Sequence, residues 1–213
     1  MKTDDLAAIL ASDAGPVGTA NFARATGLTA LAGLAACAAA VLLMVGPRID
    51  LASAMATTPV LAKFALGASV AGLALFAFQR SLRPGRAAAG VLALVLLPVA
   101  AVLAWALAVL TSQPLPAWPA LLLGRSWSAC LVLVPLYALL PLAALFVLAR
   151  RGAPVRPRLT GLAAGVGAAG LATLAYALHC PEDAAPFLAT WYPLAMTVAG
   201  GLGALAGPRL LRW

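Results

Sequence analysis

The stretch ACLVLVPLYALLPLAALFVLA, residues 129–149, decides the fold because it carries no charge and is long enough to cross a lipid bilayer. A helix rises about 1.5 Å per residue, so roughly 17–25 apolar residues span the hydrocarbon core. Five similar runs occupy residues 28–45, 60–79, 87–110, 159–178 and 187–207. Backbone groups cannot stay unpaired in lipid, so each run is expected to be a helix. The sequence therefore predicts an all-α, polytopic membrane protein with six transmembrane helices.

The composition agrees with this fold class. The chain has 213 residues, of which 64% are apolar and 9% charged, and its mean hydropathy is +1.02. Soluble domains do not have such a composition. The run at 60–79 is the least regular, because Pro59 and Lys63 lie at its start. We expect residues 1–24 to form a short, acidic, amphipathic cytoplasmic tail, and residues 25–213 to form a single transmembrane domain.

The positions of the basic residues predict the orientation of the chain. Of its 14 lysines and arginines, only Arg48, Lys63 and Arg125 fall on the side opposite the N-terminus. Short cytoplasmic loops carry most of the Lys and Arg of a membrane protein, so both termini are predicted to be cytoplasmic. The net charge of +8 is then a signal of topology and of contact with the anionic lipid of the bilayer. Direct nucleic-acid binding is not expected, since no soluble basic domain is present.

The N-terminal tail is predicted to contain a short amphipathic helix. Acidic residues occupy its first turn and apolar residues follow at i, i+3, i+4 spacing on one face. Such a helix could rest on the bilayer surface, or it could dock on a basic surface of a cytosolic partner. In the second case, the residues expected to bind the partner are Asp4, Asp5, Leu6, Ile9 and Leu10.

Two cysteines are predicted to lie at the non-cytoplasmic face. Cys130 stands near the start of the fourth apolar run, and Cys180 follows the fifth, beside His179, Glu182 and Asp183. Thiolate is a soft metal ligand and is also the side-chain group that oxidants attack first. We expect the two sulfur atoms to be neighbours on the exterior surface, where reagents in the medium can reach them. The five residues are the candidate sensor, metal or disulfide site.

The sequence also permits other interpretations of these cysteines. An oxidising outer compartment permits a disulfide, which requires Cα atoms within about 7 Å of each other. Alternatively, Cys130 is a small buried hydrophobic residue and Cys180 simply ends a helix. Cys37, among alanines in the first run, is expected to be a packing residue.

Catalytic and transport chemistry is largely missing from the sequence. No charged residue or histidine lies in the middle of any apolar run, where transporters usually carry such groups. We therefore expect no enzymatic activity. A small metal transporter or channel, or a structural subunit of a membrane complex, remains an alternative function. The pairs Gly161/Gly165 and Gly203/Gly207 permit close helix packing and, as a weaker option, a homodimer.

Several segments together resemble the NrsF family. The segment HCPED at 179–183 is the most specific, followed by the acidic start of the chain. The matching segments are MKTDDL at 1–6, GRSW at 124–127 with Cys130, RRGAP at 150–154, YALHCPED at 176–183 and RLLRW at 209–213.

The resemblance implies a function that the residues alone do not reveal. Members of this family are six-span proteins of the bacterial inner membrane that act as anti-sigma factors against an extracytoplasmic-function sigma factor, sigma-F. The resemblance further implies that Cys130 and Cys180 are needed for the response to heavy metals or oxidants. No constitutive cofactor is expected, but a heavy-metal ion could bind transiently at these thiols. The cytosolic surface for the sigma factor would come from the tail and the basic loops.

Overall fold

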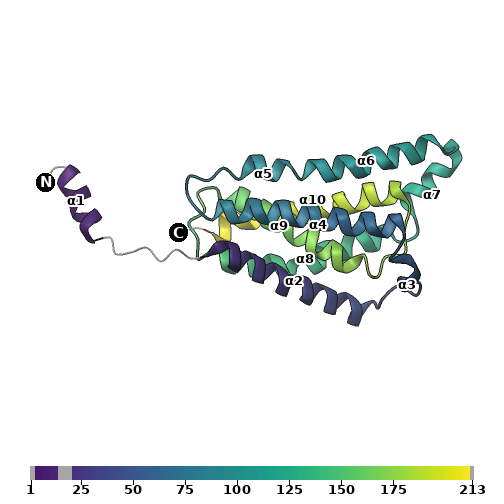
Figure 1. The fold of residues 1–213 in the computed structure, drawn as a ribbon, viewed down its shortest axis with the longest axis horizontal. Coiled ribbons are helices and arrows are strands. Elements are labelled where there is room, and N and C mark those ends of the chain that lie inside the picture. The colour runs from purple at the N-terminus through teal and green to yellow at the C-terminus, as the bar shows by residue number, and fades with distance from the viewer. Residues whose placement is uncertain (1–2, 14–20, 212–213) are drawn as a thin grey trace.

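The computed structural model describes residues 3–13 and 21–211, and the regular elements in these ranges are all helices, as predicted. Figure 1 shows them as a long bundle from which the first helix stands apart. The elements are α1 (Thr3–Asp13), α2 (Phe22–Met44), α3 (Leu51–Ala54), α4 (Thr58–Ser81), α5 (Ala89–Ala93), α6 (Leu96–Thr111), η1 (Leu115–Ala117), α7 (Trp118–Leu123), α8 (Trp127–Ala149), α9 (Pro157–Tyr176) and α10 (Ala185–Leu210).

Six helices or runs of consecutive helices are long and apolar enough to cross a membrane, which confirms the predicted number of spans. They are α2, α4, α5 with α6, η1 with α7 and α8, α9, and α10. The first span begins at Phe22 rather than near residue 28. The Asn21 side chain accepts a hydrogen bond from the Arg24 amide at 3.1 Å, and this cap starts the helix before the strongly apolar sequence begins.

Helix α9 lies at the centre of the bundle, where it packs against α10, α4, α8 and α2. Glycines allow its close approach to α10. A Cβ atom at Gly161 would overlap the Gly203 carbonyl oxygen, and one at Gly165 would overlap the Ala199 carbonyl oxygen. The predicted glycine pairs therefore pack against each other within one chain. A homodimer would need a different surface.

Helix α8 contacts α2 through a hydrogen bond that Pro141 of α8 explains. Pro141 has no N–H group, so the Tyr137 carbonyl lacks its helical donor. The Cys37 thiol of α2 donates to that carbonyl at 3.3 Å. Gly33 lets the two helices approach, since a Cβ atom there would lie 2.6 Å from the Cβ of Pro141. Cys37 therefore satisfies a backbone group that the bilayer could not satisfy.

Removing this thiol is expected to destabilise the bundle modestly. In Cys37→Ala the Tyr137 carbonyl is left buried without a donor, which costs about 1 kcal/mol. In Cys37→Ser a hydroxyl of similar size keeps the donor, and we expect less than half of that loss. SDS-titration unfolding in mixed micelles measures both. Equal stability of the alanine and serine variants would show that the hydrogen bond contributes nothing.

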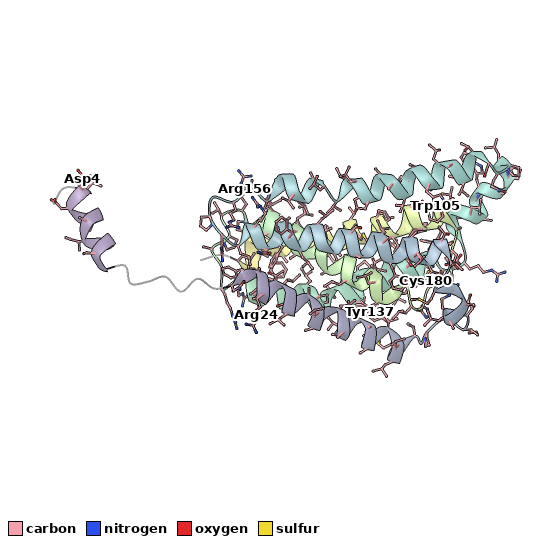
Figure 2. The ribbon with its side chains drawn as sticks, in the orientation of Figure 1. Asp4, Arg24, Trp105, Tyr137, Arg156 and Cys180 are labelled. Atoms are coloured by element: carbon pink, nitrogen blue, oxygen red, sulfur yellow. The ribbon has the colours of Figure 1, made fainter. Side chains whose placement is uncertain are left out.

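The two ends of the bundle differ in chemistry. Figure 2 shows Arg24 and Arg156 at one end, and Cys180 and Trp105 at the other. We call the first the arginine end. The second, which includes the α9–α10 connection at residues 177–184, is the thiol end.

Candidate functional site

Cys130 and Cys180 lie together in the core at the thiol end. Cys130 is in the first turn of α8, and Cys180 lies in the α9–α10 connection. Both are free thiols without exposed surface, and they are close enough to interact electrostatically. The expectation that both face the surrounding medium is wrong, because each belongs to the buried hydrophobic core of the bundle. A reagent therefore reaches either sulfur only by entering the bundle.

Two tyrosines complete the surroundings of the thiols. Tyr176 and Tyr192 are both buried, and each lies near both cysteines. The Tyr192 hydroxyl has no hydrogen-bond partner among the described residues, and the Cys180 side chain beside it does not meet hydrogen-bond geometry. Buried hydroxyls are rarely left unpaired. This hydroxyl is thus available to any polar group that forms on the Cys180 sulfur.

An ion-pair network, formed by Arg48, Asp50, Lys63 and Asp183, surrounds the backbone of Cys180. Arg48 donates to Asp183 through two nitrogens, at 2.8 and 3.1 Å, and to Asp50 at 2.7 and 2.9 Å. Lys63 donates to Asp183 at 2.7 Å, although its side chain has no exposed surface. The paired carboxylate compensates for the cost of burying this ammonium group.

The network holds its acidic members in the charged state. Burial disfavours the carboxylate of Asp183, but hydrogen bonds from Arg48 and Lys63 outweigh burial and hold its pKa below the ordinary value. The hydrogen bond from Arg48 lowers the pKa of Asp50 in the same way. The bond to Asp183 in turn raises the pKa of Arg48. Arg48, Asp50 and Asp183 therefore stay ionised at neutral pH.

Both cations of the network also hold the Cys180 backbone directly. Lys63 Nζ donates to the Cys180 carbonyl at 3.0 Å, and Arg48 Nη1 donates to it at 3.3 Å. The Arg48 amide donates to the Leu178 carbonyl at 3.0 Å. These contacts join the α2–α3 connection, α4 and the α9–α10 connection at one point, so a displacement of Cys180 must disturb all three.

His179 and Glu182 are engaged in structural contacts rather than facing the sulfur atoms. The Nδ1 atom of His179 lies 2.8 Å from the Gly46 carbonyl. Glu182 accepts from the Arg125 amide at 2.7 Å and from the Ser126 hydroxyl at 3.4 Å. Glu182 thereby places a negative charge at the N-terminus of α8, where the helix dipole favours it. This contact links the Cys180 segment to the helix that carries Cys130.

The donor set at the thiol end suits a soft ion better than a hard one. Within residues 3–13 and 21–211, no three side chains among His, Cys, Asp and Glu are grouped to hold a metal. The carboxylates and the imidazole of the predicted set already have partners. Two neighbouring thiols remain, and thiolates select soft cations. The residues that would hold such an ion are Cys130 and Cys180.

Sequence reasoning missed Arg48 and Lys63 as members of this site and counted them only as outer charges. Lys63 carried a usable signal, since a lysine inside an apolar run needs a buried partner. Asp183 was the acidic residue available at the same membrane face. The buried tyrosines gave no such signal, because tyrosine is common near membrane interfaces.

The predicted partner-binding residues lie far from the thiol end. Figure 2 places Asp4 of α1 beyond the arginine end of the bundle. Asp4, Asp5, Leu6 and Ile9 are exposed on α1, while the side chain of Leu10 lies outside the described part of the chain. The structure therefore does not bring the two predicted sites together.

Comparisons with known proteins agree over the full length of the chain. The family model of NrsF, described as "Negative regulator of sigma F", matches residues 10–213. The chain is 35% identical over 216 residues to "Probable anti-sigma-F factor NrsF" of Azospira oryzae. It is 38% identical over 224 residues to "Anti-sigma-F factor NrsF" of Caulobacter vibrioides, and each alignment covers 100% of both chains. No solved structure matches the chain. The chain therefore belongs to the NrsF family, the negative regulators of sigma F.

Proposed function

We propose that this protein is an inner-membrane anti-sigma factor with both termini in the cytoplasm. It holds an extracytoplasmic-function sigma factor at the arginine end and releases it when a heavy metal or oxidant reaches Cys130 and Cys180. The membership of a family of negative regulators supports the regulatory role. The observation that carries the sensing role is the pair of neighbouring free thiols in the core at the thiol end.

The chemistry at the thiols is of two kinds. A soft divalent cation displaces the two thiol protons and binds both thiolates. Alternatively, an oxidant such as chromate accepts two electrons while both thiol protons leave and an S–S bond forms between the cysteines. We propose that either reaction shifts Cys180 relative to α8. The unpaired Tyr192 hydroxyl gives the product a hydrogen-bond donor.

The signal has a physical route through the bundle. Arg48 and Lys63 both donate hydrogen bonds to the Cys180 carbonyl, so a shift of Cys180 acts on the end of α2 and on α4. Helix α9 ends beside Cys180 and begins at the arginine end. A reagent changes sigma affinity only by its preference between two packings, and a tenfold change requires about 1.4 kcal/mol.

Replacing the two exposed apolar residues of α1 is expected to weaken sigma binding. Leu6 and Ile9 share one face of α1 and are 42% and 56% exposed. If they anchor the sigma factor, Leu6→Ala with Ile9→Ala lowers its affinity roughly tenfold or more. The affinity is measured by adding increasing amounts of the sigma factor to the detergent-solubilised protein and co-purifying the complex. Ala8→Gln, on the opposite face of α1, is the matched control.

The alternative role of α1 predicts a different result. If α1 only rests on the bilayer surface, the double alanine variant keeps its sigma factor and loses membrane contact of the tail. Undiminished sigma binding by this variant would remove α1 from the proposed binding surface.

A further inference from the structure

Two adjoining cavities open at the arginine end, outside the site described above. One has a volume of about 400 Å³ and is basic, and the other has a volume of about 450 Å³ and is apolar. Ala89 at the start of α5 and Leu159 in the first turn of α9 line both of them. The two cavities therefore adjoin at these residues, and we call them together the recess, whose lining changes from polar to apolar.

The basic cavity lies where the α4–α5 and α8–α9 connections dock on each other. Arg80 Nε donates to the Ala87 carbonyl at 2.6 Å, and the Ala153 amide donates to the Leu82 carbonyl at 3.0 Å. Gly85 adopts a φ of 76°, which lets the first connection turn back on itself. The cavity is thus framed by the Arg80 side chain and by backbone contacts, and none of these contacts involves the side chains of Arg86 or Arg156.

The lining of this cavity is basic. Its lining includes Arg83, Arg86 and Arg156 and contains no carboxylate. Arg83 lies over the ring of Phe22, with 5.6 Å from its guanidinium carbon to the ring centroid. Arg86 and Arg156 are exposed and form no side-chain hydrogen bond or ion pair within the described part of the chain. Both guanidinium groups are available to an anion.

The apolar cavity continues from this point into the membrane-spanning part of the bundle. It runs from Ala89 to Val99 along α5 and α6, which is about 15 Å of helix, or half of the roughly 30 Å hydrocarbon core. The opposite walls come from α9 and α10. Its main apolar lining residues are Leu92, Val95, Leu96, Leu162, Val166 and Met196.

We propose that this recess binds one anionic phospholipid. The phosphate lies between Arg86 and Arg156, and an acyl chain fills the groove between α5–α6 and α9–α10. Basic pockets between helices at the cytoplasmic membrane surface are suited to anionic headgroups. The continuity with the apolar groove favours a lipid over soluble phosphate, which would leave the groove unfilled. The apolar groove also favours a lipid over the acidic helix α1 as the occupant. Helix α1 would place Asp4 and Asp5 near the arginines, but it could not enter the bilayer to fill the groove.

Native mass spectrometry of the full-length protein in detergent tests the proposal. We expect phosphatidylglycerol to be retained in preference to phosphatidylcholine. Arg86→Gln with Arg156→Gln is expected to lower phosphatidylglycerol retention on the order of tenfold. Arg24→Gln with Arg151→Gln removes the same charge from exposed positions outside the recess and is expected to leave retention unchanged.

A second variant tests whether the acyl chain binds in the apolar groove, and it leaves the charge of the protein unchanged. Val99→Trp narrows the groove and is expected to lower phosphatidylglycerol retention at least fivefold, with the two arginines intact. Glycerol phosphate at millimolar concentration is not expected to displace the lipid. The proposal is overturned if both lipids are retained equally, if the two arginine pairs behave alike, if Val99→Trp has no effect, or if glycerol phosphate competes. A rise in retention in Asp4→Asn with Asp5→Asn would identify α1 as the occupant instead.

Discussion

Replacing both cysteines of the thiol end is expected to abolish the proposed release of the sigma factor. In Cys130→Ser with Cys180→Ser, no soft ligand pair and no dithiol remain at the thiol end, because the third cysteine, Cys37, lies on α2 and donates to a carbonyl of α8. Serine keeps the size of each side chain, so the bundle and its sigma binding are retained. Cadmium or chromate then leaves sigma-dependent transcription at its uninduced level.

A reporter gene under a sigma-dependent promoter measures this result in cells. Cys37→Ser is the matched control, since it removes one thiol from the same bundle and is expected to respond as the unaltered protein does. Full induction of the double variant by either reagent would show that the thiols are not the sensor. Constitutive induction without reagent would show instead that the variant fails to bind sigma, which co-purification separates from loss of sensing.

Removing the Asp183 carboxylate is expected to destabilise the protein strongly. In Asp183→Ala the buried ammonium of Lys63 loses its charged partner and keeps only the Cys180 carbonyl. Breaking a buried pair costs about 3–5 kcal/mol. We expect roughly 3 kcal/mol, at the lower end of this range, because the Asp183 side chain is 32% exposed. SDS-titration unfolding in mixed micelles measures the loss.

Two further variants separate the charge effect from other causes. In Asp183→Ala with Lys63→Met, the unpaired charge is removed as well, and a large part of the lost stability is expected to return. Asp50→Asn, whose side chain is 56% exposed, is expected to cost far less stability than Asp183→Ala. If Lys63→Met fails to rescue Asp183→Ala, the destabilisation does not come from the buried ammonium.

The same network predicts a loss of stability in acid. The folded-state pKa of Asp183 is below its ordinary value, so the unfolded chain binds more protons in acid than the folded chain. The stabilisation is complete above the ordinary carboxyl pKa of about 4 and declines as the pH falls further. Thermal unfolding in detergent between pH 7 and pH 3 measures the decline. Asp183→Asn is expected to start at lower stability and to show a shallower decline, with Asp50 accounting for the remainder.

The burial of both thiols bears on the proposed sensing role. Arg48 and Lys63 both donate to the Cys180 carbonyl, so a movement of the Cys180 backbone must break these bonds. In the proposed sensor, a reagent reaches either thiol only by entering the bundle. A reaction that moves Cys180 would then alter contacts in several helices at once. The unpaired Tyr192 hydroxyl is the kind of unsatisfied buried group that native structures usually keep for a reason.

The sequence by itself determined the number of spans and their approximate positions, although the first span begins at Phe22 rather than near residue 28. Whether a segment crosses the bilayer depends on its own transfer free energy, and residues 129–149 carry that information without reference to any other part of the chain. The glycine pairs likewise indicated close packing from their spacing, although Gly161 does not reveal that Gly203 is its partner.

Only the tertiary structure decided what surrounds the cysteines. The contact between Arg48 and Asp183 joins residues 135 positions apart, and the Lys63 contact joins residues 120 apart. Such pairs depend on the rotation and tilt of packed helices, which local hydropathy does not specify. The burial of both sulfur atoms follows from the same packing. A sequence could therefore place Cys130 and Cys180 at one membrane face, but the packed bundle alone decided that they lie inside it.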